Sequence, residues 1–110
     1  MKLIQALVRP GKLDALRGAL EDACVPSITI MSVRYRGPEK RPATAFRGFL
    51  VSEDYVDKLE IEMVVQDDDV DRIVGVILRT ARTGAPGDGH VSISPIEHRY
   101  DIHSGYRETC

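Results

Sequence analysis

Several residue types are scarce or missing in this chain of 110 residues. It has no tryptophan and no asparagine, so it offers no acceptor for N-glycosylation. Its two cysteines, Cys24 and Cys110, are too few for a disulfide framework and lack the spacing of a metal site. No apolar run approaches the roughly 20 residues that span a bilayer, and the first residues lack a signal peptide's apolar stretch. We therefore expect a soluble, cytoplasmic protein.

An excess of positive charge is also absent. The chain has 15 Lys and Arg residues and 17 Asp and Glu residues, which gives a net charge of -2 and no overall attraction for nucleic acid. Hydrophobic residues make up 43% of the chain, which suits one ordinary domain over residues 1–110 with a single core. Composition thus argues against a general DNA or RNA binder and against a two-domain protein.

The spacing of apolar residues predicts four strands and two helices. Alternating or continuous apolar and β-branched residues indicate strands at residues 2–9, 28–35, 59–65 and within 90–100. Apolar residues at three- and four-residue steps indicate helices at residues 12–23 and 70–82. Two split βαβ units with right-handed crossovers give an α+β, ferredoxin-like sandwich, in which a four-stranded antiparallel sheet carries both helices on one face. The other sheet face would be left uncovered, so we expect an oligomer.

Residues 36–57 have no clear apolar period and contain two prolines and two glycines. Exposed loops of about 20 residues are uncommon in compact domains and are usually functional. Charge is also uneven here, because residues 34–47 hold five basic residues and one acidic one, whereas residues 53–69 hold eight acidic residues and one basic one. These runs are either solvated faces or a basic loop that meets an acidic partner or an anion.

The glycine-rich stretch from Thr83 to His90 is the most informative local motif. Its backbone N–H groups could approach a phosphate closely, although a helix stop followed by a tight turn would use the same glycines. His90 could act as acid or base in a small hydrolase, but no partner residue for it is evident. His90 and His98 would lie roughly 26 Å apart along one strand, so a metal site that also used His103 could form only across subunits.

The two cysteines differ in their expected surroundings. Cys24 follows the apolar stripe of a helix, and we expect it to be a small buried hydrophobic residue. Cys110 is the last residue, and we expect it to be exposed and without a strongly basic neighbourhood.

Four segments together resemble the PII signal-transduction proteins of nitrogen and carbon regulation, and the similarity runs nearly without gaps from Met1 to about Gly105. The segments match the family's opening strand and helix start, its T-loop, its third strand, and its second helix with the following B-loop. They are Val8-Arg9-Pro10-Gly11-Lys12-Leu13-Asp14, Phe46-Arg47-Gly48, Ile61-Glu62-Met63-Val64-Val65, and Arg79-Thr80-Ala81-Arg82-Thr83-Gly84 with Gly87-Asp88-Gly89.

The resemblance implies a non-enzymatic, ferredoxin-like homotrimer that regulates transporters or enzymes through its T-loop, here about residues 36–57. It also implies three adenine-nucleotide sites in clefts between subunits. By position, the residues that would line the adenosine end are Thr29, Gly37, Glu62 and Val64, and those that would lie at the phosphates are Gly87, Asp88, Gly89 and His90.

This sequence departs from the nitrogen-sensing members at positions that hold ATP phosphates with basic side chains. Those positions are Pro38, His90, Asp101 and His103, the last two in a C-terminal tail over about residues 100–110. Each lost charge-assisted hydrogen bond costs about 1.5–3 kcal/mol, so ADP or AMP is favoured over ATP. The glutamine that helps to bind Mg²⁺ and 2-oxoglutarate is Glu39 here, and its carboxylate would repel a dicarboxylate.

The pattern resembles the divergent PII-like branch found with inorganic-carbon uptake and carboxysome genes. That resemblance implies bicarbonate as a second ligand, held by Lys40, Arg47 or Lys58, and a membrane transporter that recruits the protein. Two alternatives stay open: a nitrogen-regulatory protein that senses ATP and 2-oxoglutarate, and a metal-binding trimer of similar fold.

Overall fold

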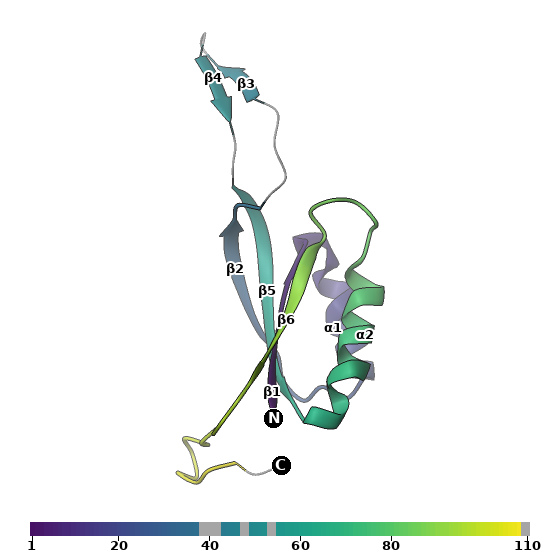
Figure 1. Cartoon of the computed structure of the whole chain (residues 1–110), viewed down its shortest axis with the longest axis vertical. Coiled ribbons are helices and arrows are strands. Elements are labelled where there is room, and N and C mark those ends of the chain that lie inside the picture. Colours follow the sequence, from purple (N-terminus) through teal and green to yellow (C-terminus); the bar gives the residue numbers. More distant parts are fainter. Residues whose placement is uncertain (38–42, 47–48, 53–54, 109–110) are drawn as a thin grey trace.

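The computed structural model describes residues 1–37, 43–46, 49–52 and 55–108. Within these ranges two helices and six strands follow one another, as Figure 1 shows. Short 3₁₀ turns at Pro10–Lys12 and Asp67–Asp69 lead into the two helices. In chain order the elements are β1 (Lys2–Val8), α1 (Leu13–Asp22), β2 (Thr29–Tyr35), β3 (Ala43–Phe46), β4 (Phe49–Ser52), β5 (Val56–Val65), α2 (Val70–Ala81) and β6 (Gly89–Pro95).

Four of these strands form one antiparallel sheet in the order β2-β5-β1-β6. Both helices pack on the same face of this sheet (Figure 1). The ferredoxin-like fold predicted from the sequence is therefore confirmed, and β1 is an interior strand as its continuous apolar sequence suggested. Among the described residues no helix is both long enough and apolar enough to cross a membrane.

The hydrophobic core lies between the sheet and the two helices. Alternate residues of the central strands point toward the helices, because successive side chains of a strand face opposite sides. The helices contribute residues at three- and four-residue spacings, as an amphipathic helix does. The buried residues are Ile4, Ala6, Val8, Leu16, Leu20, Ile61, Met63, Val65, Ile73, Ile77 and Ala81.

The sheet face opposite the helices, the open face, is polar at its centre. Glu60 and Glu62 of β5 alternate with the buried residues and project there. The side-chain amide of Gln5 on β1 donates to a carboxylate oxygen of each, at 3.4 Å for Glu60 and 2.9 Å for Glu62. A single amide thus bridges two like charges on the middle of the open face.

The expectation of an irregular loop over residues 36–57 is wrong in two respects. Strands β3 and β4 pair as a separate two-stranded hairpin with Phe46 opposite Phe49, and β5 begins at Val56. The hairpin lies well beyond the end of the main sheet (Figure 1), and the chain measures 60 Å along its longest axis against 29 Å and 21 Å along the others. The segments on either side of Arg47-Gly48 are rich in β-branched and aromatic residues, which favours a hairpin. Below, residues 36–57 are called the projecting segment.

The last strand is shorter than expected. β6 ends at Pro95, so His98 does not continue the strand on which His90 lies. The chain after it folds into a turn in which Tyr100 and Arg107 form a β-bridge and the Asp101 amide donates to the Tyr106 carbonyl at 3.0 Å. Pro95 lacks an amide hydrogen and therefore favours the end of a strand.

Cys24 is exposed, so the expectation of a buried hydrophobic residue is wrong. Its φ angle is +64°, and its amide donates to the Glu21 carbonyl while the Val25 amide donates to the Leu20 carbonyl, both at 3.0 Å. These bonds form a Schellman motif, which ends α1 with a residue in the left-handed region. The position is one that glycine normally occupies, and the motif turns the Cys24 side chain away from the core.

We predict that Cys24→Gly stabilises the protein by about 1 kcal/mol, because an L-residue with a Cβ atom pays that cost in the left-handed region. The measurement is the free energy of unfolding from chemical denaturation at one fixed protein concentration. Cys24→Ala is the matched control, since it removes the thiol but keeps the Cβ atom, and it should leave stability nearly unchanged. Equal stabilisation by both variants would contradict the explanation.

Candidate functional site

The glycine loop, defined here as Thr83–Gly89, connects α2 to β6. Three of its glycines have positive φ angles, namely Gly84 at +88°, Gly87 at +93° and Gly89 at +104°. Glycine adopts such angles without the steric cost that other residues pay. The loop therefore reverses the chain tightly at one end of the sheet.

The carboxylate of Asp88 holds the glycine loop together from inside. Its Oδ2 accepts hydrogen bonds from the backbone amides of Thr83 and Gly84, both at 3.0 Å, and its Oδ1 accepts one from the Thr83 hydroxyl. The Thr83 oxygen in turn accepts the Ala85 amide at 3.2 Å. The Asp88 side chain thus satisfies the amides at the start of the loop. The backbone of Asp88 itself lies on the other side of the turn.

Arg9, the residue after β1, neutralises this carboxylate. Its Nε donates to Asp88 Oδ1 at 3.0 Å and its Nη2 donates to the Pro86 carbonyl at 2.8 Å. The pKa of Asp88 lies far below its usual range, chiefly because the carboxylate accepts the Thr83 hydroxyl and amide, with further contributions from Arg9 and Gly84. The loop is therefore built around a carboxylate that stays ionised at neutral pH.

Lys58 attaches the loop to the middle of the sheet. Its side chain is 6% exposed, and its ammonium group donates to the carbonyl of Gly87. Because β5 is a central strand, this bond reaches from the sheet interior to the loop. The carbonyls of Pro86 and Gly87 are thus bound by Arg9 and Lys58.

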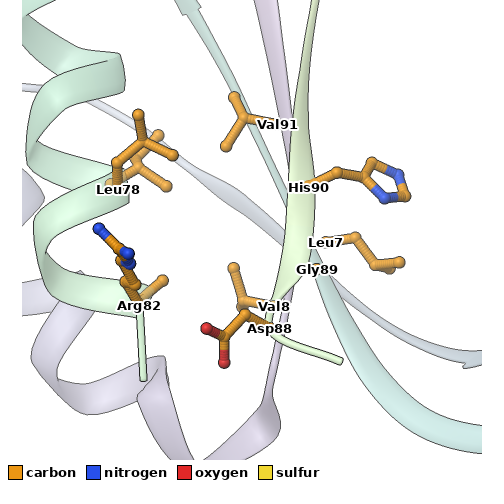
Figure 2. Close-up of a pocket in the computed structure, with 10 residues that line it drawn as sticks. Leu7, Val8, Leu78, Arg82, Asp88, Gly89, His90 and Val91 are labelled. Atoms are coloured by element: carbon orange, nitrogen blue, oxygen red, sulfur yellow. The ribbon is translucent and has the colours of Figure 1, made fainter. Parts of the chain in front are cut away.

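Gly89 allows the loop to enter the sheet. It pairs with Val8, and a Cβ atom added to it would lie 1.7 Å from the Leu7 carbonyl oxygen. A pocket of about 110 Å³ lies beside it, between the end of α2 and the start of β6. Figure 2 shows Val91 directed toward α2, whereas His90 projects from the other side of the strand. His90 is therefore on the open face, outside the space between helix and sheet.

The residues assigned to the adenosine end fall into two groups. Thr29 and Glu62 lie directly opposite each other on β2 and β5, and Val64 lies two residues further along the same face of β5. Gly37 follows the other end of β2, which is the end near the glycine loop. Within one chain Thr29 and Glu62 are thus brought together, and Gly37 is not beside them.

The remaining predicted site residues have different positions. Gly87, Asp88, Gly89 and His90 follow one another at the glycine loop, as expected, but the Asp88 side chain is used to hold the loop. Lys40 and Arg47 lie outside the described residues, as do Pro38, Glu39 and Cys110.

The tail residues and histidines show no metal-binding arrangement. Arg107 Nη1 lies 3.0 Å from His98 Nδ1, and the Asp101 carboxylate accepts the Ser104 amide at 3.2 Å. In the parts of the chain that the structure describes, no group of three or more His, Cys, Asp or Glu side chains could hold a metal ion.

Sequence reasoning missed Arg9, Thr83 and Tyr35 as parts of this region. Arg9 follows the strand that pairs with β6, so the predicted topology already brings it to the end of the sheet where Gly89 begins that strand. Thr83 lies five residues before Asp88, within reach of a local hydrogen bond of the kind that Asp favours in turns. The ring of Tyr35 lies 5.9 Å from that of His90, which no spacing in the sequence could indicate.

These features define a class of protein: a small ferredoxin-like domain with a glycine loop before its last strand and a long projecting insertion in the middle. Residues 1–106 match the family described as Nitrogen regulatory protein P-II. The chain is 38% identical over 109 residues to the nitrogen regulatory protein P-II of Microchaete diplosiphon and, equally, to that of Nostoc punctiforme. Each alignment covers 99% of this chain and 97% of the relative. The chain belongs to the nitrogen regulatory protein P-II family.

Family membership confirms the resemblance to the PII proteins and the regulatory role that it implied, and it does not distinguish the branch found with inorganic-carbon uptake. P-II proteins are regulatory signal transducers that act on partner proteins, and they are not enzymes. The alternative of a small hydrolase with His90 as acid or base is therefore set aside.

We predict that Gly89→Ala destabilises the protein by at least about 3 kcal/mol, because its Cβ atom would overlap the Leu7 carbonyl and force β6 away from β1. Gly84→Ala is the matched control, since its φ is also positive but nothing lies within 4 Å of the added atom. It should cost only about 1–2 kcal/mol. Denaturant unfolding of both variants checks this, and similar losses would contradict the role given to the close approach.

We predict that Asp88→Asn lowers stability at neutral pH and that this difference shrinks in acid. The folded protein holds the pKa of Asp88 below its usual range, so the stabilisation is fully present above the unfolded pKa of about 3.9 and is lost as the pH falls below it. Urea unfolding at pH 7, 5, 4 and 3 measures the difference. Asp14→Asn is the control, since Asp14 is 88% exposed and forms a surface ion pair with Arg17, and its difference should stay near zero throughout.

Proposed function

We propose that this P-II family protein is a homotrimer that binds an adenine nucleotide between subunits, with ADP or AMP preferred to ATP. Binding changes how the projecting segment contacts a membrane transporter or enzyme, which we propose belongs to inorganic-carbon uptake, with bicarbonate as a second ligand. The observation that carries the proposal is the glycine loop, a set of backbone donors fixed by a carboxylate that is already neutralised.

The backbone of the loop supports a phosphate site. In the described part of the chain, the amides of Gly87 and Asp88 have no hydrogen-bond partner, whereas those of Thr83 and Gly84 are used by the Asp88 carboxylate. Adjacent amides in a turn with alternating φ signs form a concavity that attracts anions. Gly87 and Gly89, both with positive φ, lie on either side of Asp88.

The arrangement of the sheet supports a site shared by two copies. Thr29 is on the edge strand β2 and the loop enters the opposite edge strand β6, so three strand spacings, about 14 Å, separate these two strands. Gly89 also lies three residues along β6 from Ser92, the residue in register with Thr29. A ring in which the β6 edge of one copy meets the β2 edge of the next brings the adenosine and phosphate ends together. Apolar side chains are exposed near both edges, with Ile30 on β2 39% and Ile93 on β6 47% exposed.

The preference for ADP or AMP is supported by the cations around the loop. Arg9 and Lys58 bind loop carbonyls, and the ring of His90 lies against that of Tyr35 on the open face. A γ-phosphate therefore gains few charge-assisted hydrogen bonds from these residues.

Bicarbonate fits the remaining chemistry. It is a small planar anion that one cation and a few backbone donors can hold. Lys58 lies at the loop, where its ammonium group already donates to the Gly87 carbonyl, so bicarbonate would have to share this cation. Lys40 and Arg47 of the projecting segment are the other candidates. In this proposal the protein works in the cytoplasm and moves to the membrane when its projecting segment binds the transporter.

The names of the relatives favour a second candidate function. Both are called nitrogen regulatory protein P-II, which suits a sensor of ATP and 2-oxoglutarate. The two candidates differ in the ligand that binds best and in whether Mg²⁺ and 2-oxoglutarate or bicarbonate strengthens binding.

We predict by calorimetric titration that ADP or AMP binds at least about tenfold more tightly than ATP, and that bicarbonate strengthens this binding. Light scattering of the same sample should give the mass of three chains. Tight ATP binding that depends on Mg²⁺ and 2-oxoglutarate would instead establish the nitrogen-sensing function. No binding of any of the three nucleotides would remove the nucleotide proposal altogether.

A gain-of-function variant makes this test sharper. His103→Arg restores a guanidinium at a position that is basic in nitrogen-sensing members and should tighten ATP relative to ADP by about tenfold or more. His98→Arg adds the same group five residues earlier in the chain, before the tail, and should change neither affinity. An equal effect of both variants would indicate general electrostatic attraction.

A further inference from the structure

The two edge strands of the sheet are joined by a contact between aromatic rings. Tyr35 is the last residue of β2, and His90 is the second residue of β6. Their ring centroids are 5.9 Å apart with an interplanar angle of 63°, which is an edge-to-face geometry that aromatic pairs favour. Because β5 and β1 lie between these strands, the rings meet across the open face.

The burial of the residues between the rings agrees with this arrangement. Leu7 pairs with His90 on β1, and Lys58 lies two residues from the partner of Tyr35 on β5. They are 8% and 6% exposed, although they share the open face with the half-exposed Glu60 and Glu62. Two rings that meet above the central strands would produce such local cover.

Each ring belongs to a different functional part of the chain. His90 directly follows Gly89, whose position is fixed by its close approach to the Leu7 carbonyl. The position of the His90 ring therefore depends on the position of the end of the glycine loop. Tyr35 lies at the base of the projecting segment, in the stem formed by residues 33–37 and 55–57. A cation–π contact of 5.9 Å between Arg34 and the Tyr55 ring joins the two sides of this stem.

We propose that Tyr35 is a positioning residue that acts through His90, so that the glycine loop and the stem of the projecting segment fix each other's position. The proposal rests on the proposed function for its ligand, but the contact itself exists without ligand. In this arrangement His90 contacts Tyr35, and the loop backbone binds the anion. Since coupling between two sites is reciprocal, whatever orders the loop orders the stem, and whatever holds the stem strengthens binding at the loop.

The expected size of the coupling follows from the contact. Aromatic pairs in this geometry contribute an amount that corresponds to about 2- to 12-fold in an equilibrium constant. The effect is therefore small enough to leave the fold intact and large enough to measure by hydrogen exchange.

The test perturbs the loop and measures amide hydrogen exchange in the stem, at residues 33–37 and 55–57. Asp88→Asn weakens the hydrogen bonds that hold the loop, so in the wild-type background exchange in the stem should rise by about 2- to 12-fold. The same rise should occur in Tyr35→Phe, which keeps the ring, and should be absent in Tyr35→Leu. His90→Leu should behave as Tyr35→Leu does, and combining the two should add nothing further.

A second arm uses ADP as the probe. Stem amides should be protected by ADP in the wild type and in Tyr35→Phe, and protection should be lost in Tyr35→Leu, which should bind ADP about 2- to 12-fold more weakly. A rise in stem exchange that survives Tyr35→Leu, or no rise on Asp88→Asn in the wild type, overturns the proposal. Complete loss of ADP binding in His90→Leu overturns it too, because His90 would then hold the nucleotide directly. If the wild type binds no ADP, the nucleotide function is wrong, and the ligand-free arm still decides whether the contact couples loop and stem.

Discussion

The ionised carboxylate of Asp88 determines the geometry of the end of the molecule where the candidate site lies. It accepts hydrogen bonds from the amides of Thr83 and Gly84 and pairs with Arg9, so a largely exposed turn of glycines acquires a fixed shape. An acidic residue beside an anion site would ordinarily repel its ligand. Here the carboxylate pairs with Arg9 and accepts the Thr83 and Gly84 amides on one side of the turn. The amides of Gly87 and Asp88 lie on the other side. The charge of Asp88 thus serves the folding of the loop.

The ring that we propose uses surfaces other than the open face of the sheet. An uncovered sheet face was the reason to expect an oligomer, yet the centre of that face is polar, with Gln5 bridging Glu60 and Glu62. Exposed apolar side chains include Ile30 and Ile93 on the two edge strands, and also Leu78 on α2 and Tyr100, Ile102 and Tyr106 after β6. Contacts between two different edges are head-to-tail interfaces, which form rings where the rotation closes. A polar centre of the open face and apolar side chains on the edge strands agree with the ring that we propose.

Sequence reasoning succeeded where one periodic signal decided the outcome. The alternation of β5 and the apolar stripes of both helices predicted the sheet, its covered face and the core, and the glycines predicted the turn before β6. It failed where local geometry overrode composition. Cys24 is exposed because α1 ends in a Schellman motif. This motif requires a left-handed backbone conformation, which a cysteine in the sequence does not predict. The hairpin β3–β4 was hidden within a segment rich in glycine and proline. The role of Asp88 and its contact with Arg9 required the register of β1 with β6, which is a long-range property.

The placement of Thr29 and the glycine loop on opposite edges of one sheet bears on genetic complementation. In the proposed ring, assembled edge to edge, every site would combine the β2 edge of one copy with the loop of its neighbour. A chain damaged at its β2 edge still contributes a sound loop, and a chain damaged in its loop still contributes a sound edge. If the proposed ring forms, two defective alleles expressed together would rebuild working sites at those interfaces where the sound halves meet, whereas neither allele alone would build any.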